Sequence, residues 1–117
     1  MTMSNPRLSI RLDFANGDRL GPGKIALLEA IRSKGSITVA AQHLGMSYRR
    51  AWLLIQAINK TLQQPAVATS QGGADRGGTV LTPVGEEVIK LYRSIEGRSH
   101  TSVHQECLAI SRLVRRK

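Results

Sequence analysis

The sequence predicts a mainly α-helical domain with small β-hairpins, an α+β fold class, and three observations support this. Over most of the chain, apolar residues recur at steps of three and four, which is the spacing of one face of an α-helix. Two shorter stretches are β-prone and contain turn signals, Asn16-Gly17 in the first and the glycine-rich segment 72–78 in the second. With 117 residues the chain is long enough for one domain with a modest core.

Residues 8–20 predict a small N-terminal hairpin, and a helix follows it. Apolar and polar residues alternate along the first strand, so one of its faces is apolar. The apolar positions are Leu8, Ile10, Leu12 and Phe14. The Asn-Gly pair favours a tight turn, and we expect residues 1–7 to be disordered. The helix begins near Pro22 and ends at Gly35, which gives it about three turns.

Residues 36–64 predict two helices joined by a tight turn, which is the outline of a helix-turn-helix. The first helix is short and ends at Gly45, because glycine reaches positive φ without steric cost. We expect Ser47 to cap the second helix by accepting a hydrogen bond from a free backbone N–H. The predicted buried positions are Ala40, Ala41 and Leu44 in the first helix and Ala51, Leu54, Ile55, Ile58 and Leu62 in the second.

The opposite face of the second predicted helix carries positive charge and makes double-stranded DNA the leading partner. A helix has the diameter to enter a major groove, where Arg and Gln read base edges and Lys contacts phosphate. The candidate DNA-binding residues in this segment are Ser47, Tyr48, Arg49, Arg50, Gln56 and Lys60. The alternative is a helix pair inside an ordinary all-α core, because such motifs also match by chance.

Residues 66–70 and 79–81 are β-prone runs on either side of the glycine-rich segment, and they predict a second hairpin. A hairpin directly after the second helix is a wing, so the fold becomes a winged helix-turn-helix. Arg76 at its tip is a candidate contact to the DNA backbone or the minor groove. A phosphate-binding loop of a nucleotide enzyme is excluded, because that pattern requires a lysine here. A plain hairpin without any contact is the alternative.

The charge of the chain also favours a nucleic-acid partner. The chain contains 17 Lys and Arg against 8 Asp and Glu, a formal net charge of +9, and its pI is about 10.9. Attraction to an anionic membrane is disfavoured, because the chain lacks a basic amphipathic helix with bulky aromatics. Single-stranded nucleic acid is disfavoured as well, because base stacking needs more aromatic residues than this chain has.

Thr82-Pro83 opens another helix, with Thr82 as the expected cap and Glu86 and Glu87 in the first turn. Its predicted buried stripe consists of Val84, Val88, Leu91, Tyr92 and Ile95. The pattern fades near Gly97, where the sequence leaves open a kinked continuous helix or two helices with a break.

We expect residues 8–96 to form the winged helix-turn-helix domain and residues 97–117 to form a C-terminal helical extension. The extension has an apolar stripe at Val103, Cys107, Ile110 and Val114. This stripe is the candidate interface of a homodimer, since two copies match palindromic half-sites. The alternative is that the stripe covers the first helix of its own domain.

Two sequence runs together resemble a known family. Gly-Met-Ser-Tyr-x-x-Ala-Trp ends at Trp52, and Leu81-Thr-Pro-Val-Gly85 follows the glycine-rich segment. With Asn59, they resemble the N-terminal winged-helix domain of ModE, the molybdate-responsive transcriptional regulator, over about residues 8–95. The Ser-x-x-x-Ala-Ala core is shared with the LysR-type DNA-binding domain, the nearest competitor, and Trp52 favours ModE. The resemblance implies a dimer that represses or activates promoters, with a link to molybdenum metabolism.

ModE regulators bind the oxyanion through a separate C-terminal β-rich module, and no run of strands follows the Thr82 helix here. We therefore expect a ModE-type regulator that lacks the molybdate-binding module and needs no cofactor. An oxyanion response would then be absent or would come from a separate oxyanion-binding partner.

Three other functions are alternatives to DNA binding. His100, His104 and Cys107 are spaced i, i+4 and i+7, so a continuous helix would place a zinc, nickel or copper ligand set on one face, as in a metal sensor. No fourth ligand is evident, and we expect no metal site. An enzyme is disfavoured, because a Cys-His pair in a basic tail offers no pocket. A winged helix that only holds another protein is the third alternative.

The single cysteine excludes an intramolecular disulfide. Since the sequence shows neither a signal peptide nor a membrane-spanning run, we expect a bacterial-type cytoplasmic protein with no membrane partner.

Overall fold

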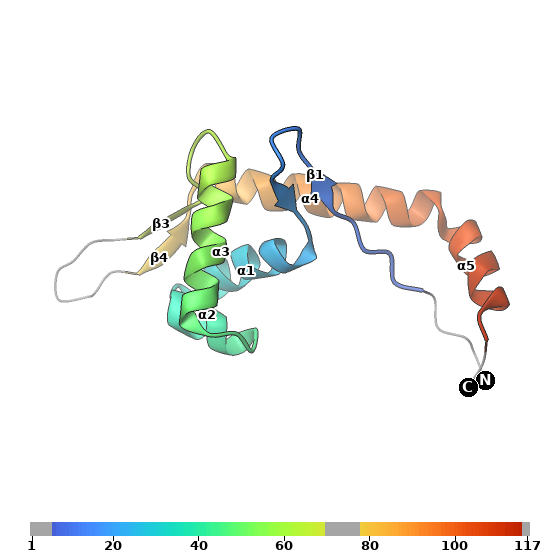
Figure 1. Cartoon of the computed structure of the whole chain (residues 1–117), viewed down its shortest axis with the longest axis horizontal. Helices are drawn as coiled ribbons and strands as arrows, with labels where there is room; N and C mark the ends of the chain where they lie inside the picture. The colour runs from blue at the N-terminus through green and yellow to red at the C-terminus, as the bar shows by residue number, and fades with distance from the viewer. Residues whose placement is uncertain (1–5, 70–77, 116–117) are drawn as a thin grey trace.

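The computed structural model describes residues 6–69 and 78–115, and it confirms the predicted class of a helical domain with two small hairpins. The elements are β1 (Leu12–Asp13), β2 (Arg19–Leu20), α1 (Pro22–Lys34), α2 (Ile37–His43), α3 (Tyr48–Thr61), β3 (Val67–Thr69), β4 (Thr79–Leu81), α4 (Pro83–Ser102) and α5 (His104–Leu113). The molecule is elongated, 57 × 32 × 21 Å, because the second half of α4 extends from the body and α5 bends away from it (Figure 1).

The turn between α2 and α3 confirms the predicted helix-turn-helix. Gly45 has a φ of 70°, in the left-handed region that glycine adopts without strain. Ser47 Oγ then accepts a hydrogen bond of 3.1 Å from the backbone N–H of Arg50, so α3 begins with the side-chain cap expected there. Ser36 caps α2 in the same way, through the N–H of Val39. Both helices of the motif therefore start at a fixed residue.

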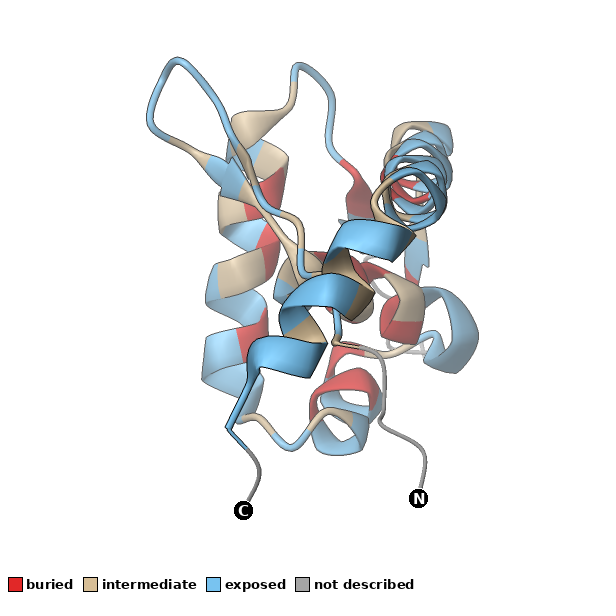
Figure 2. Cartoon of the chain, turned by 90° about the vertical axis from the view of Figure 1, so that its right-hand side faces the viewer, coloured by how far each residue is buried: buried red, intermediate tan, exposed pale blue. Residues whose placement is uncertain are grey.

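The hydrophobic core lies between α1, α2, α3 and the first half of α4. Ile25, Leu27, Leu28 and Ile31 of α1 have no exposed surface. The predicted stripe of α3 is confirmed: Ala51, Ile55 and Ile58 are buried, and Leu54 and Leu62 pack half-buried at the margin. Figure 2 shows the consequence, with the buried residues of α3 on its inner side and its exposed residues outside. Each large aliphatic residue buried in this way contributes about 1.5–3 kcal/mol.

The wing is the antiparallel pair β3–β4, with Val67 opposite Leu81 and Thr69 opposite Thr79. Two contacts attach it to the helices. Asn59 of α3 accepts from the backbone N–H groups of Ala66 (2.9 Å) and Val67 (3.2 Å) and donates to the Val67 carbonyl (3.1 Å). On the other strand, the N–H of Thr79 donates to the carbonyl of Gly35 at the end of α1. The base of the wing is thereby fixed beside α3.

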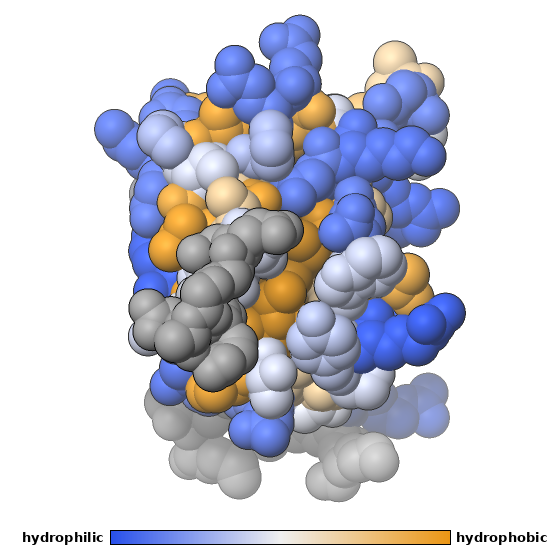
Figure 3. All heavy atoms as spheres, turned by 90° about the vertical axis from the view of Figure 1, so that its left-hand side faces the viewer, coloured by the Kyte–Doolittle hydropathy of each residue, from blue (hydrophilic) through white to orange (hydrophobic). Residues whose placement is uncertain are grey.

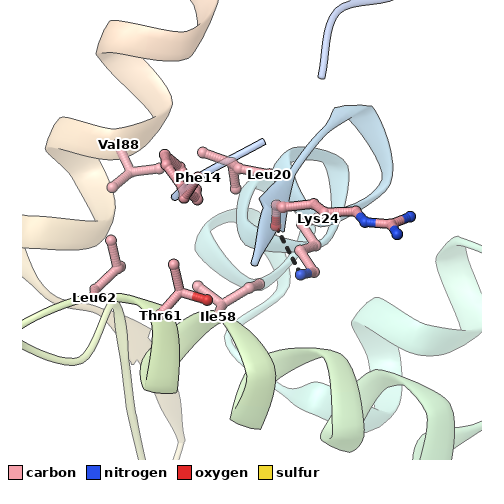
Figure 4. A pocket seen from close by; sticks show the side chains of 8 residues that line it. Phe14, Leu20, Lys24, Ile58, Thr61, Leu62 and Val88 are labelled. Atoms are coloured by element: carbon pink, nitrogen blue, oxygen red, sulfur yellow. Dashed lines mark hydrogen bonds between the residues drawn. The ribbon is translucent and has the colours of Figure 1, made fainter. Parts of the chain in front are cut away.

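The N-terminal hairpin is shorter than predicted, since only Leu12–Asp13 and Arg19–Leu20 pair. Residues before β1 are extended but form no ladder, and Tyr92 of α4 donates to the Ile10 carbonyl at 2.6 Å. The hairpin itself packs against the body: Figure 4 shows Phe14 and Leu20 pointing toward side chains of α3 and α4. The prediction of a strand from Leu8 was wrong, because the alternating residues meet a helix rather than a second strand.

The start of α4 is fixed against the segment that precedes the wing. Thr82 Oγ1 accepts from the N–H of Gly85, which confirms the expected cap, and donates to the Pro65 carbonyl. A Cβ added at Gly85 would overlap the carbonyl oxygen of Ala66. Glycine is therefore required here by close approach of two backbones.

The predicted stripe of α4 was wrong in its second half. Tyr92 is buried as expected and Val88 packs half-buried, but Leu91 and Ile95 are exposed, and Ile89 is buried in their place. The inner face of α4 follows Gly85, Ile89 and Tyr92, so Leu91 lies off this face. Ile95 lies beyond Tyr92, the last buried residue of the helix.

The helix break lies at Val103, six residues after Gly97, where the sequence pattern had left a break open. α4 continues through Gly97 to Ser102, and α5 starts at His104. None of the residues of α5 is buried. Along the predicted stripe, Val103 and Cys107 are half-buried, whereas Ile110 and Val114 are 62% and 61% exposed. The stripe therefore does not cover the first helix of its own domain.

Candidate nucleic-acid interface

The outer face of α3 presents polar and charged side chains to solvent. Because the buried stripe faces the core, the residues half a turn away face outward. All of the residues predicted on this helix are exposed, namely Ser47, Tyr48, Arg49, Arg50, Gln56 and Lys60. They thus share one helix, and Arg50 lies on the flank of the line formed by Arg49, Gln56 and Lys60. Ser47 has a second role, since its hydroxyl oxygen caps the helix.

The cations of this face are free of acidic partners in the described part of the chain. The ion pairs found there join Arg11 to Asp13, Arg32 to Glu86, and Arg93 to Glu29 and Glu96. None of these pairs contains Arg49, Arg50 or Lys60. Their charge is therefore available to an anionic partner.

Three large apolar side chains interrupt the polar surface of α3. Tyr48, Trp52 and Leu53 are 53%, 43% and 47% exposed. Elsewhere on the molecule, on the side from which the wing projects, hydrophilic side chains also border an apolar area (Figure 3). Trp52 and Leu53 were not predicted as site residues, although their exposure follows from the helical period. Exposed apolar groups beside cations suit the thymine methyl groups and sugars of a DNA groove.

The base of the wing lies next to the same face. Asn59 holds β3 to one side of α3 through its hydrogen bonds. Trp52 lies on the same side of the helix, two turns before Asn59. Arg76 and the rest of segment 70–77 lie outside the described residues. The contact of Arg76 with DNA therefore stays a prediction from the sequence.

The candidate metal ligands do not form a site. The rings of His100 and His104 lie 5.9 Å apart in a T-shaped arrangement, and Cys107 lies beyond the break at Val103 as a half-buried free thiol. Within residues 6–69 and 78–115, no group of three His, Cys, Asp or Glu side chains is arranged to hold a metal ion. The continuous helix on which the metal hypothesis depended is interrupted.

No helix in the described ranges is both long enough and apolar enough to cross a membrane.

A capped helix exposed after a tight turn, with a hairpin fixed at its side, defines the winged helix-turn-helix class. No family model matches the chain. It is similar to a molybdenum-pterin-binding protein MopB from Rhodobacter capsulatus, with 48% identity over 80 residues, which are 68% of this chain and 30% of MopB. It is also similar to a molybdenum transport protein ModE from Azotobacter vinelandii, with 38% identity over 96 residues, 82% of this chain and 36% of that protein.

These similarities confirm the ModE resemblance: the chain is homologous to the N-terminal DNA-binding region of ModE-type proteins. It spans about a third of the length of the two relatives. Neither relative is named as an enzyme, which agrees with the prediction of a non-enzymatic chain.

The fold also matches the DNA-binding domain of CbnR, a LysR-type domain solved in complex with DNA. The TM-score is 0.59 at 22% identity, and the match covers 75% of this chain and 95% of that domain. At this identity the likeness shows the fold.

Proposed function

We propose that the chain is a sequence-specific transcriptional regulator of the ModE type that binds double-stranded DNA through α3. The observation that carries the proposal is the exposed outer face of α3. There, three cations without an acidic partner among the described residues surround polar and apolar groups suited to a major groove. Homology to the DNA-binding region of ModE supports it.

Each predicted residue has a role in this proposal. Arg49 and Gln56 read base edges, because both offer paired hydrogen-bonding groups that match guanine and adenine. Lys60 and Arg50 contact phosphates, and the exposed start of α3 at Ser47 and Tyr48 faces the backbone. Arg76 of the wing contacts the backbone or the minor groove next to the site of α3.

The regulator acts as a homodimer in this proposal, with the stripe Val103, Cys107, Ile110 and Val114 in the interface. Exposure of Ile110 and Val114 supports this, because their own domain leaves both uncovered. Two α3 helices related by a two-fold axis would read the two halves of a palindrome.

Selection from random duplex DNA tests the proposal. The purified chain is incubated with a random pool at low salt, and the retained duplexes are sequenced over several rounds. We expect enrichment of one palindromic motif and an affinity for it that falls steeply as salt is raised. Failure to retain any duplex at low salt would refute DNA binding, and retention without enrichment would refute sequence specificity.

A further inference from the structure

A basic concavity of about 250 Å³ lies beside α3, on the flank opposite the wing. Its lining comes from β2, the start of α1, the α2–α3 turn and α3 itself. The lining residues include Arg19, Gly21, Gly23, Lys24, Met46 and Arg50. Of these, only Arg50 belongs to the face predicted from the sequence. The hairpin and α1 thus add two cations to the surroundings of α3.

The three cations are held together by the fold. Lys24 is half-buried, and its Nζ donates to the backbone carbonyl of Arg19 at 2.9 Å, as the dashed line in Figure 4 shows. This bond uses one of the three ammonium donors and leaves two for a ligand. The exposed side chain of Arg19 starts from the same strand, and Arg50 closes the concavity from α3.

Acidic groups do not neutralise this cluster in the part of the chain that the structure describes. Within residues 6–69 and 78–115, no ion pair contains Arg19, Lys24 or Arg50. Asp18 precedes Arg19 in the sequence, and its carboxylate accepts a hydrogen bond of 3.0 Å from the hydroxyl of Thr61, the last residue of α3. Three neighbouring cations without a counter-charge favour an anionic ligand, and guanidinium groups match the geometry of phosphate.

We propose that this concavity binds a backbone phosphate of the duplex whose major groove receives α3. The proposal rests on the proposed function and deepens it. A groove has a sugar-phosphate backbone on each side, and the wing lies on the Asn59 side of α3. The concavity lies on the Arg50 side and meets the other backbone. β2 and α1 thereby become part of the interface.

Neutralisation of single cations tests the contact. Lys24→Gln and Arg19→Gln are compared with Lys90→Gln, an exposed lysine of α4 away from the concavity. Affinity for the selected duplex and for a random duplex is measured over a range of salt. We expect each of the first two variants to weaken binding to both duplexes alike and to reduce the slope of log K against log salt by about 0.9. Lys90→Gln should keep the wild-type slope.

Arg19→Gln distinguishes the loss of a phosphate contact from a change in the folded structure. Lys24→Gln loses a bond to the hairpin, whereas Arg19→Gln keeps that bond because its acceptor is a backbone carbonyl. Wild-type slopes in both variants, with Lys60→Ala still weakening binding, would overturn the concavity while leaving the proposed function intact. Absence of duplex binding by the wild type would overturn both.

Titration with inorganic phosphate distinguishes a DNA phosphate from a free phosphate as the ligand. Phosphate binding that is lost in Lys24→Gln, with unchanged DNA slopes, would identify a free-anion site and overturn the DNA contact.

Discussion

Arg49 and Lys60 stand near the two ends of the exposed line of α3, and their side chains offer different chemistry. The guanidinium group of Arg49 presents paired donors that match the O6 and N7 acceptors of guanine. The ammonium group of Lys60 is a point charge that binds any phosphate equally well. Residues at the start of a recognition helix are also the ones that reach base edges in helix-turn-helix complexes. In the proposed function, position and chemistry therefore favour a role in specificity for Arg49 and a role in general affinity for Lys60.

We predict that Arg49→Ala and Lys60→Ala separate these two contributions. Arg49→Ala should cost about 1–3 kcal/mol on the selected duplex and much less on a random one. Lys60→Ala should weaken binding to both duplexes by a similar factor and make the salt slope shallower by about 0.9. Titrations of each variant against both duplexes, at two salt concentrations, measure the effects. Equal losses of Arg49→Ala on both duplexes would assign Arg49 to phosphate.

Gly85 provides a prediction for stability at the residue scale. Gly85→Ala should destabilise the fold by about 1–3 kcal/mol, because the new Cβ overlaps the Ala66 carbonyl and forces the start of α4 away from the wing. Thermal or urea unfolding measures the change. Gly97→Ala is the matched control on the same helix: no atom lies within 4 Å of its added Cβ, so helix propensity alone should stabilise the protein by up to about 1 kcal/mol. Similar behaviour of the two variants would contradict the close approach.

At the scale of elements, ion pairs join α1 to α4. Arg93 of α4 donates to both carboxylate oxygens of Glu29 on α1 and to Glu96 on its own helix. The hydrogen bonds from Arg93 are the main reason that the pKa of Glu29 lies below its ordinary value of 4.5; partial burial opposes this shift, and the charges of Arg93 and Arg32 add to it. The hydrogen bonds to the carboxylates of Glu29 and Glu96 in turn raise the pKa of the Arg93 guanidinium.

The lowered pKa of Glu29 predicts a pH-dependent contribution to stability. A carboxylate with a depressed folded-state pKa stabilises the fold above its unfolded-state pKa, and this stabilisation is lost as the pH falls through the folded-state value. Glu29→Gln should therefore lower the free energy of unfolding at pH 7, by less than about 1 kcal/mol because the pair is partly exposed. The difference from wild type should shrink as the pH falls below 4.5. Denaturant unfolding across this range measures it. Glu87→Gln, which removes an exposed carboxylate of α4 outside the ion pairs of the described residues, is the control for the loss of one negative charge.

Local sequence signals predicted the helix-turn-helix closely. Glycine at Gly45 and serine at Ser47 act within one turn of their own position, so their effects do not depend on the rest of the fold. The outward residues of α3 followed from the same period. Contacts between distant residues could not be predicted in this way. Examples are the anchoring of β3 by Asn59 and the concavity of Arg19 and Lys24, which depend on how the hairpin packs.

The second half of α4 shows the limit of periodicity more directly. A stripe of apolar residues indicates that a helix has one apolar side, but it does not indicate whether another element covers that side. Leu91 and Ile95 continue the apolar pattern yet remain exposed, because Leu91 lies off the inner face of Ile89 and Tyr92 and Ile95 lies beyond the last buried residue. Gly97 is tolerated inside the helix at a cost of about 1 kcal/mol. The break falls instead at Val103, where neither glycine nor proline stands, and no local signal accounts for it.

The whole molecule divides into a body with a core and a projecting segment without one. Among the described residues, none after Tyr92 is buried, so the end of α4 and α5 contribute little to the core of their own domain. Figure 1 shows this segment extending away from α3 and the wing. The segment is therefore available for contacts between molecules, and the proposed dimer places it between two bodies.

Removal of residues 100–117 tests this arrangement at the scale of the assembly. Because the cut spares every buried residue, we expect the thermal unfolding temperature of the body to be nearly unchanged. The molar mass in solution should shift from dimer towards monomer, and affinity for the palindromic duplex should approach that for a single half-site. Light scattering and titrations measure both. Ile110→Asp, which charges the stripe, should act like the truncation, whereas Gln105→Asp adds the same charge to another side of α5 and should leave the dimer intact. A dimer mass that survives both the truncation and Ile110→Asp would exclude the stripe as the sole interface.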